Sequence, residues 1–473
     1  MDGSTLDAAL FWAYFWVVTR EFLFIAAIGI VVFGIDEIIV DLIYLGTSLK
    51  KKLVTYRRHA RWTVSNIPVQ QPEGRFAIFI PAWDESEVIA PMLRRLTSIM
   101  DHGNYDVFIG VYPNDPDTLA AVTAVGNARI RIVMNDRDGP TTKADCLNRI
   151  WEVMSAQEQA GGFTYKGIVL HDAEDVVHAA EMRIFDYLMP RFAMVQLPVI
   201  PLRDNNSRWI SGHYQDEFAE HHGKTLVVRE TLGAAIPSAG VACAFDREVL
   251  GELAAESGAG PFDADSLTED YELGMALSRR RRGIFVRLPE KDGSGAVATR
   301  EHFPADLESA LRQKTRWLLG IAFQSWDRLG WKGTLADKYM MLRDRKPMMN
   351  AIIIFIAYIA SILFAVTIVA RWLDPVAARL PSVIPEGSFI AFLILLATIS
   401  VLWRLFMRFW FTTSVYGLVD GLLSIPRVII ANVVGMLAAR RALWRYAALV
   451  FTGKALAWEK TAHRFPDEKA RHG

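Results

Sequence analysis

The sequence predicts an α/β domain with a mainly parallel sheet, joined to an α-helical transmembrane region. In the middle of the chain, strand-like apolar runs alternate with segments of helical length, which is the pattern of a parallel sheet covered by helices. Further along, residues 348–370 carry no charge, and residues 387–403 form a second uncharged run. Because a helix needs about 20 apolar residues to cross a bilayer, we expect both runs to span a membrane.

The overall composition agrees with a membrane-associated protein and argues against a nucleic-acid function. Of the 473 residues, 52% are hydrophobic, and the 52 Lys and Arg residues are balanced by 52 Asp and Glu residues. A polyanion-binding protein needs a clear basic excess, which this chain lacks. Two cysteines, Cys146 and Cys243, are too few for a disulfide framework or a thiolate metal site, and we interpret them as buried free thiols.

A further span is expected near the N-terminus. Residues 22–35 are uncharged, and the span extends from them toward residue 8 or toward residue 45. The leading residues are acidic rather than basic, so we expect this segment to be retained rather than cleaved as a signal peptide. Basic residues follow the span closely, whereas none precedes Arg20, and the positive-inside rule then places the chain from residue 50 onward in the cytoplasm.

The segment 411–439 is apolar but contains Asp420, Pro426 and Arg427. Three arginines follow it, and a fourth span would put them outside the cell. We therefore expect an interfacial or re-entrant segment, three spans and a cytoplasmic C-terminus. The predicted parts are a membrane segment with a basic linker at 1–62, a soluble domain at 63–345, a transmembrane hairpin with interfacial or re-entrant helices at 346–439, and a basic tail at 440–473.

Polar and acidic residues follow the predicted strands of the soluble domain, where the ligands of α/β proteins bind. "FIPAWDESEVI" places Asp84 and Glu85 at the first strand end, and "VYPNDPDT" places Asp115 at the second. Taken alone, helix capping and a turn explain these acids best. Lys143 in "GPTTKADCLN" lies just inside a helix start, where contact with a phosphate and exposure to solvent carry equal weight.

The stretch "GIVLHDAEDVVH" crowds Asp172, Glu174 and Asp175 directly after a strand that is predicted to be buried. Mg²⁺ and Mn²⁺ prefer oxygen ligands and are commonly held by one or two carboxylates together with substrate phosphates. We therefore favour a metal site over a helix cap with spare surface acids. Along an extended strand end, residues 172 and 174 point the same way, so we expect Glu174 rather than Asp175 to join Asp172 at the ion.

Two later motifs supply candidates for catalysis and for acceptor binding. "SLTEDYEL" places Asp270 at a helix start, where it is either a capping acid or, if it faces the metal site, a general base. "LRQKTRWLLG" brings Gln313 and Arg316 to neighbouring faces of a helix, with Trp317 beside them. Arginine suits a diphosphate, and tryptophan stacks on a sugar or anchors a helix at the membrane surface; both alternatives remain open.

Taken in order, these motifs resemble those of the membrane-bound family 2 glycosyltransferases, which have the GT-A fold and include cellulose, chitin and hyaluronan synthases. The resemblance covers roughly residues 76–317, and "DAED" is also similar to the acid motif of bacterial inner-membrane relatives described as bacteriophage adsorption protein B. Two features depart from the family: "NDPD" lacks the paired aspartates often seen at the second strand, and "DAE" replaces the commoner DxD. The resemblance implies a Rossmann-like GT-A domain that faces the cytoplasm.

The resemblance also implies roles for individual donor-binding residues. The pocket for the base and the ribose would be lined by Asp84, Glu85 and Asp115. Lys143 would lie near the nucleotide. Asp172 and Glu174 would take the place of the DxD motif and bind Mg²⁺ or Mn²⁺ together with the donor diphosphate.

On the acceptor side, the resemblance implies an inverting transfer. Asp270 of "TED" would be the catalytic base that takes the proton of the acceptor hydroxyl. Gln313, Arg316 and Trp317 match the QxxRW motif of the family and would lie at the acceptor and the diphosphate. Arg316 and the metal ion would stabilise the departing nucleoside diphosphate.

The implied function is sugar transfer from a nucleotide sugar, with UDP-sugars as the leading donors, to a growing exopolysaccharide or cell-envelope glycan at the bacterial inner membrane. Because few spans make a thin wall for a polysaccharide channel, export implies a partner protein or a homo-oligomer. Two alternatives stay open. One is transfer of a single sugar to a lipid-linked acceptor such as polyprenyl phosphate or diacylglycerol, and the other is a non-catalytic membrane scaffold or phage-adsorption component.

Overall fold

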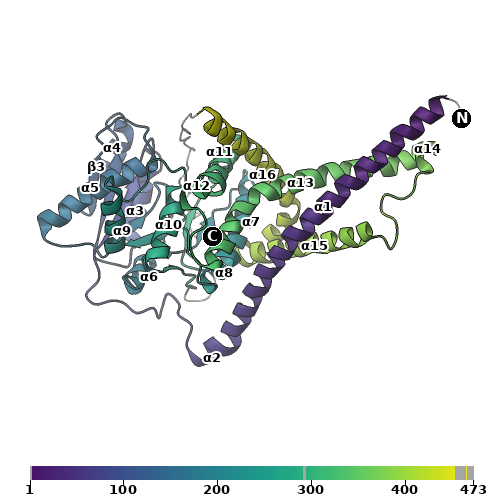
Figure 1. Cartoon of the computed structure of the whole chain (residues 1–473). Coiled ribbons are helices and arrows are strands. Elements are labelled where there is room, and N and C mark those ends of the chain that lie inside the picture. The colour runs from purple at the N-terminus through teal and green to yellow at the C-terminus, as the bar shows by residue number, and fades with distance from the viewer. Residues whose placement is uncertain (1–2, 291–294, 453–464, 466–473) are drawn as a thin grey trace.

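The computed structural model of the chain describes residues 3–290, 295–452 and 465. An α/β part is joined to a group of long helices that extend away from it (Figure 1). The chain begins in one of these helices, forms the α/β part and then returns to the remaining long helices. The predicted combination of an α/β domain with an α-helical, membrane-like region is therefore confirmed.

The centre of the α/β part is a seven-stranded sheet with the strand order β3-β2-β1-β4-β7-β5-β8. Its strands are β1 (Phe76–Pro81), β2 (Tyr105–Val111), β3 (Ile130–Met134), β4 (Gly167–Leu170), β5 (Met194–Gln196), β7 (Cys243–Asp246) and β8 (Gly283–Phe285). Among the described strands of this sheet, β7 alone runs antiparallel to its neighbours, β4 and β5. The sheet is mainly parallel as predicted, while β7 lies in a stretch for which the sequence predicts no strand.

A second sheet has two strands, β6 (Val199–Pro201) and β9 (Thr299–Glu301), which pair in parallel. The short strand β9 brings Glu301 close to the carboxyl end of β4, because Val176 bridges to Arg300. A segment more than one hundred residues further along the chain thereby reaches the acid cluster of "HDAED".

The central strands of the large sheet are buried on both faces. Consecutive residues of β1 point to opposite faces, so Ile78 and Ile80 join one apolar core while Ala77 and Phe79 join another. Burial on both faces explains why the central strands appear in the sequence as continuous apolar runs. The helices of this part are α3 (Ile89–Ile99), α4 (Pro116–Thr123), α5 (Lys143–Gly161), α6 (Glu181–Leu188), α7 (Ile210–Glu220), α8 (Leu226–Thr231), α9 (Arg247–Ser257), α10 (Glu269–Arg280), α11 (Leu307–Trp317) and α12 (Ser325–Leu329).

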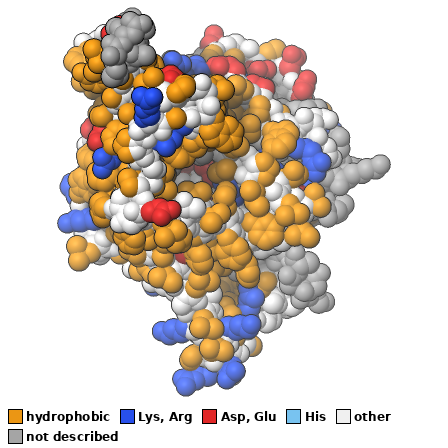
Figure 2. Space-filling model, turned by 90° about the vertical axis from the view of Figure 1, so that its right-hand side faces the viewer, with side chains coloured by type: hydrophobic (Ala, Val, Ile, Leu, Met, Phe, Trp, Pro, Cys, Tyr) orange, Lys and Arg blue, Asp and Glu red, His pale blue; other side chains and the backbone are white. Residues whose placement is uncertain are grey.

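In the described part of the chain, four helices are long and apolar enough to cross a membrane, by length and composition. They are α1 (Gly3–Lys50), α13 (Leu335–Leu373), α15 (Phe389–Tyr416) and α16 (Leu418–Thr452). α1 packs along α13 and α15, and the short helix α14 (Pro375–Ala378) lies at their far end (Figure 1). Seen from that end, the surface of the molecule is largely hydrophobic (Figure 2).

Two of the predicted boundaries fall inside continuous helices. α13 passes through residue 345, and α16 passes through residue 439. The segment 411–439 is not one element, because Gly417 separates the end of α15 from the start of α16. α16 adds a fourth candidate span to the three that the sequence predicts. It also packs against α7 and α11 of the α/β part, and its interfacial placement stays a prediction.

Candidate active site

A cavity of about 1050 Å³ lies beyond the carboxyl ends of β1, β2 and β4, between the α/β part and the long helices. Predicted site residues that line this central cavity are Glu85, Lys143, Asp172, Glu174, Asp270, Gln313, Arg316 and Trp317. They come from loops and helices that are far apart in the sequence, and the fold brings them together. Asp84 and Asp115 do not line it.

Asp84 and Asp115 instead fix the shape of the loop that follows β1. The backbone N–H of Asp84 donates to Asp115 Oδ2 at 2.6 Å, and Asp84 adopts a left-handed backbone conformation with φ of 54°, which Asp tolerates better than most residues. Asp115 Oδ1 accepts from the backbone N–H of Thr118 at 3.2 Å and so caps α4. The structure thus places Asp115, for which the sequence favours a turn, at the N-cap of α4, while the N-cap residue of α3 is Val88.

Lys143 occupies the first position of α5, inside the capping box that Thr142 and Asp145 form. Its ammonium group forms an ion pair with Asp172 across the cavity. Burial disfavours the charged form, but the carboxylates of Asp172 and Glu269 outweigh it and raise the pKa of Lys143 above its ordinary value. The cavity therefore holds a fixed positive charge beside the acid cluster, at a helix N-terminus that itself favours anions.

The three acids of "HDAED" point in two directions. Asp172 and Glu174 both line the cavity. Asp175 is fully buried behind them, where His171 Nδ1 lies 2.9 Å from Asp175 Oδ2 and His171 Nε2 lies 2.8 Å from Glu181 Oε1. Although burial opposes the charge, the carboxylates of Glu181 and Asp175 raise the pKa of His171 to about 10.

The carboxylates at this end of the cavity suit a divalent cation. Among the described residues, no group of three or more His, Cys, Asp and Glu side chains forms a complete metal site. Asp172 and Glu174 supply two carboxylates, and Mg²⁺ or Mn²⁺ commonly completes such a set with phosphate oxygens and water. Burial and then the charges of Asp175 and Glu174 raise the pKa of Glu301 well above its ordinary value. This local excess of negative charge favours a cation, so the residues present fit the ion.

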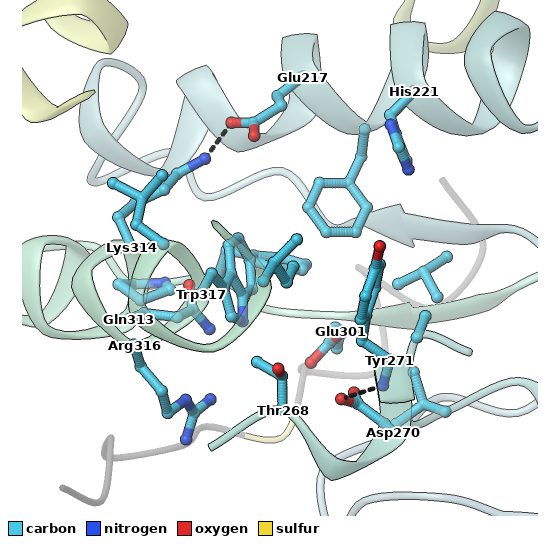
Figure 3. Close-up of a pocket in the computed structure, with 18 of the residues that line it drawn as sticks. Glu217, His221, Thr268, Asp270, Tyr271, Glu301, Gln313, Lys314, Arg316 and Trp317 are labelled. Atoms are coloured by element: carbon cyan, nitrogen blue, oxygen red, sulfur yellow. Dashed lines mark hydrogen bonds and ion pairs between the residues drawn. The ribbon is translucent and has the colours of Figure 1, made fainter. Parts of the chain in front are cut away.

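Asp270 lies in the first turn of α10 and faces the cavity, opposite Trp317 (Figure 3). The backbone N–H of Tyr271 donates to Asp270 Oδ1 at 2.7 Å. Burial raises the pKa of Asp270 although Lys143 opposes the shift. Gly240 leaves room for the carboxylate, because a Cβ there would lie 2.6 Å from Asp270 Oδ2. A half-buried, cavity-facing carboxylate of raised pKa has the properties of a general base.

The helix α11 presents its "QxxRW" residues to the same cavity (Figure 3). Arg316 and Trp317 extend from it toward the side on which Asp270 lies. Lys314 points the other way and forms an ion pair with Glu217 of α7. Its Nζ lies 5.2 Å from the centroid of the Trp317 ring, so the cation holds the indole in place.

Four further residues of the site, Glu217, Glu301, His302 and Lys314, have no local signal in the sequence. Glu217 and Lys314 form a pair only because α7 packs near α11, and no local pattern predicts a contact between residues 97 positions apart. Glu301 lies on a strand of three residues that is too short for an alternating pattern to show. Its neighbour His302 also lines the cavity. The sequence around His302 does not show the spacing of a known metal-ligand motif.

Comparison with known proteins identifies the domain. Residues 72–320, more than half of the chain, match the family described as glycosyltransferase like family 2. The chain is 35% identical over 451 residues to bacteriophage adsorption protein B of Escherichia coli strain K12, an alignment that covers 92% of this chain and 60% of that protein. The same values hold for bacteriophage N4 adsorption protein B of Escherichia coli O157:H7. The chain thus spans about three fifths of the length of these relatives.

Among solved structures, the fold is similar to that of a mannosyltransferase from Pyrobaculum calidifontis in complex with GDP-Man and Mn²⁺. The TM-score is 0.52 at 16% sequence identity, and the match covers 89% of this chain and 99% of that one. The likeness supports the GT-A fold of the α/β part. This chain belongs to the family described as glycosyltransferase like family 2 and carries membrane-like helices, as the motifs "DAED", "TED" and "QKTRW" and the apolar runs of the sequence predict.

Proposed function

We propose that the protein is a membrane-anchored, inverting glycosyltransferase that moves a sugar from a nucleotide-sugar donor to a growing exopolysaccharide or cell-envelope glycan. The observation that carries this proposal is the convergence of Asp172, Asp270 and Arg316 on one cavity. A transferase of this kind needs a site for the diphosphate, a base for the acceptor and a cation for the leaving group. Asp172 would hold the metal ion at the diphosphate, Asp270 would be the base, and Arg316 would be the cation.

The proposed transfer step is a single displacement. The acceptor hydroxyl attacks the anomeric carbon of the donor while Asp270 takes its proton. A bond forms between the acceptor oxygen and the anomeric carbon, and the bond from that carbon to the diphosphate oxygen breaks. The nucleoside diphosphate leaves with the electron pair, and the configuration at the anomeric carbon inverts because attack and departure occur on opposite faces.

The leaving group would be stabilised by the positive charges around it. Arg316 and Lys143 both line the cavity, and a guanidinium and an ammonium group suit a diphosphate. Asp172 and Glu174 would hold Mg²⁺ or Mn²⁺, which when bound neutralises the diphosphate charge. Glu85 lines the cavity beyond β1 and would contact the nucleoside, while Asp84 and Asp115 would shape this loop from behind.

We further propose that the catalytic domain faces the cytoplasm of a bacterium from its inner membrane. The helical segments that follow α1, at Lys51–Thr55 and Tyr56–Arg58, carry exposed basic side chains and lead into the α/β part. The positive-inside rule favours a cytoplasmic location for such a segment. A partner protein or a second copy of the chain would then serve export of the product. The names of the two Escherichia coli relatives refer to bacteriophage adsorption, so a role as a phage-adsorption component is the second candidate.

The test is donor turnover by the purified full chain in lipid nanodiscs. Nucleoside diphosphate release is measured across a panel of UDP- and GDP-sugars with Mn²⁺ or Mg²⁺, with extracted envelope membranes as the source of acceptor. We expect release with at least one donor and its loss in Asp270→Asn. Silence of the wild-type chain with every donor would contradict the enzyme proposal and favour the phage-adsorption component.

A further inference from the structure

The central cavity does not end at the predicted site residues but continues between two of the long helices. α13 and α16 pack against each other, and both contribute to the lining. From α13, beginning at its internal proline, the lining residues are Pro347, Asn350, Ala351 and Ile354. From α16 they are Ala431, Asn432, Gly435 and Met436. One continuous space therefore connects the catalytic acids with the membrane-like helices.

The polarity of the lining changes along this space. At its inner end, the carboxylate of Glu37 on α1 is surrounded by Arg343 at 3.0 Å, Lys346 at 2.7 Å and Arg404 at 2.7 Å. Asp36 also pairs with Arg343 and Lys346, and Glu220 pairs with Arg404, so three carboxylates balance the three cations. Further out, from Pro347 onward, none of the described residues that α13 and α16 contribute to the lining is charged. Two of these residues are asparagines, and the others are apolar or glycine. The space thus grades from charged groups through two amides to hydrocarbon.

The outer surface of the same helices is suited to lipid. Large apolar side chains are exposed on both, among them Met349, Ile352 and Phe355 on α13, and Ile429 and Val433 on α16. Seen from the far end of the long helices, the hydrophobic surface is hollowed near its centre (Figure 2). A hydrocarbon chain in the surrounding lipid would meet apolar walls on entering this space, at little cost in polar desolvation.

We infer that the acceptor is lipid-anchored, with its hydrocarbon chain between α13 and α16 and its polar head at Asp270 and Trp317. The inference rests on the proposed function and names the acceptor class for the same site. The volume supports it, because pockets for one drug-sized ligand measure about 300–1,000 Å³, and the cavity exceeds that range. A bare glycan chain would need hydrogen-bond partners along its path, and the apolar lining offers two amides.

The transfer step is the one given above, with the hydroxyl of the lipid head as the attacking group. Asp270 receives its proton, the new glycosidic bond joins the head to the sugar, and the nucleoside diphosphate leaves. Where the head is a phosphate instead, its oxygen attacks as an anion and no proton passes to Asp270. A lipid with a hydroxyl head and polyprenyl phosphate therefore share the hydrocarbon chain, but only the hydroxyl head needs Asp270 as a base.

Gly435 allows a direct test of this route. A Cβ at Gly435 meets no atom of the described residues within 4 Å, so a larger side chain there extends into open space rather than into packed described neighbours. Gly435→Trp places an indole where the hydrocarbon chain would lie. Gly46 on α1 is the matched control, because a Cβ there also meets no atom of the part of the chain that the structure describes within 4 Å, and the residue does not line the cavity. Gly46→Trp therefore tests for general effects of an indole on a long helix.

The experiment uses the full chain in nanodiscs with a radiolabelled donor and Mn²⁺. Two products are counted: label extracted into organic solvent with diacylglycerol, a glycolipid fraction or polyprenyl phosphate supplied, and label in water-soluble glycan. We expect wild type and Gly46→Trp to form extractable product, and Gly435→Trp to form at least about tenfold less, because the indole occupies the space of the chain. Product with polyprenyl phosphate that persists in Asp270→Asn would identify the phosphate head.

Donor binding separates failure of this inference from failure of the proposed function. The rise in melting temperature on adding nucleotide sugar with Mn²⁺ reports binding to the folded state. If wild type binds donor but forms only water-soluble product, or if Gly435→Trp forms extractable product at the wild-type rate, the lipid-anchored acceptor is overturned and the transferase function stands. If wild type neither binds nor turns over any donor, both are overturned.

Discussion

The imidazole of His171 lies between two buried carboxylates, 2.9 Å from Asp175 and 2.8 Å from Glu181. Asp175 Oδ2 also accepts from the backbone N–H of Asp172 at 3.1 Å. These two contacts of Asp175 Oδ2, with His171 and with the backbone of Asp172, hold the Asp175 side chain inside the protein. The loop that it anchors carries Asp172 and Glu174 on the cavity wall. The acid cluster therefore contains a structural residue and two candidate ligands.

This division predicts opposite effects for two neighbouring substitutions. Asp175→Asn removes a charge partner of His171, and we expect the free energy of unfolding to fall by about 1–3 kcal/mol, the range for a lost buried hydrogen bond to a charged group. The Mn²⁺ concentration needed for half-maximal donor turnover should not change. Asp172→Asn should leave the melting temperature of the ligand-free chain nearly unchanged and raise the Mn²⁺ requirement. Thermal unfolding and Mn²⁺ titration of donor turnover measure the two effects. A raised Mn²⁺ requirement in Asp175→Asn would place Asp175 at the ion instead.

The acids of α10 predict a pH dependence. Burial and the neighbouring Asp270 raise the pKa of Glu269 to about 7, and burial raises that of Asp270 as well. A base works only when deprotonated, so turnover should be lost as the pH falls through this raised range and should be full above it. Asp270→Asn should lower the rate by about 10²–10⁴-fold, the usual contribution of a general base. The measurement is the rate of nucleoside diphosphate release as a function of pH.

Glu269→Gln supplies the control for this pH profile. The substitution removes a neighbouring carboxylate but leaves Asp270 in place, so the acid limb should move to lower pH with activity retained at high pH. An unchanged acid limb in Glu269→Gln would show that the limb reports a different group. An acid limb that persists in the residual activity of Asp270→Asn would lead to the same conclusion.

The sequence predicts those parts of this molecule that depend on local pattern. The strands β1, β2 and β4 are continuous apolar runs because both faces of the sheet are buried, and each ends in residues that reach the cavity or shape its edge. The antiparallel strand β7 has four residues, and its direction is set by pairing with β4 and β5. That pairing depends on contacts between distant segments, which a local pattern does not contain.

The helix boundaries show a second limit. Charged residues precede Pro347 in α13 and apolar ones follow it, so composition predicts a domain boundary there. The backbone continues through it as one helix from Leu335 to Leu373, with the proline inside. Where a helix passes from the α/β part into apolar surroundings, its composition changes but the helix continues. A helix ends only where its backbone hydrogen bonds are lost. The predicted role of Glu174 rested on strand alternation, which is local, and the structure places its side chain with that of Asp172 on the cavity.

Gly274 predicts a steric limit on the helix that carries Asp270. A Cβ at Gly274 of α10 would lie 2.1 Å from the backbone N of Ser238 and 2.7 Å from the backbone C of Pro237. Both residues belong to a loop that lines the cavity, so Gly274→Ala must shift either the loop or the helix. We expect a loss of about 1–3 kcal/mol in stability, as for overpacking of a core, together with slower turnover. Thermal unfolding and donor turnover check this, with Gly46→Ala as the control because its added Cβ meets no atom within 4 Å. Equal stability of Gly274→Ala and wild type would show that the loop yields freely.

The last prediction concerns the attachment of α16 to the α/β part. Asp216 of α7 is fully buried and accepts from Arg427 Nη2 of α16 at 2.8 Å and from Arg408 Nη2 of α15 at 3.2 Å. Asp216→Ala leaves the buried guanidinium of Arg427 without this partner, and breaking a buried pair costs about 3–5 kcal/mol. We expect a lower melting temperature in detergent and faster proteolysis between α15 and α16.

Two further variants separate loss of this pair from a general effect of substitution. Asp216→Ala combined with Arg427→Met removes both charges, and the double variant should recover much of the stability, because the cost of the single variant comes mainly from the unpaired charge. Glu256→Gln breaks an exposed pair with Arg280 and should leave the melting temperature unchanged, since exposed pairs contribute little. If Asp216→Ala melts at the wild-type temperature, the ion pair does not hold α16 in place. Its packing against α11 would then be the stronger attachment, and the position of α16 would depend on the helix that carries Arg316 and Trp317.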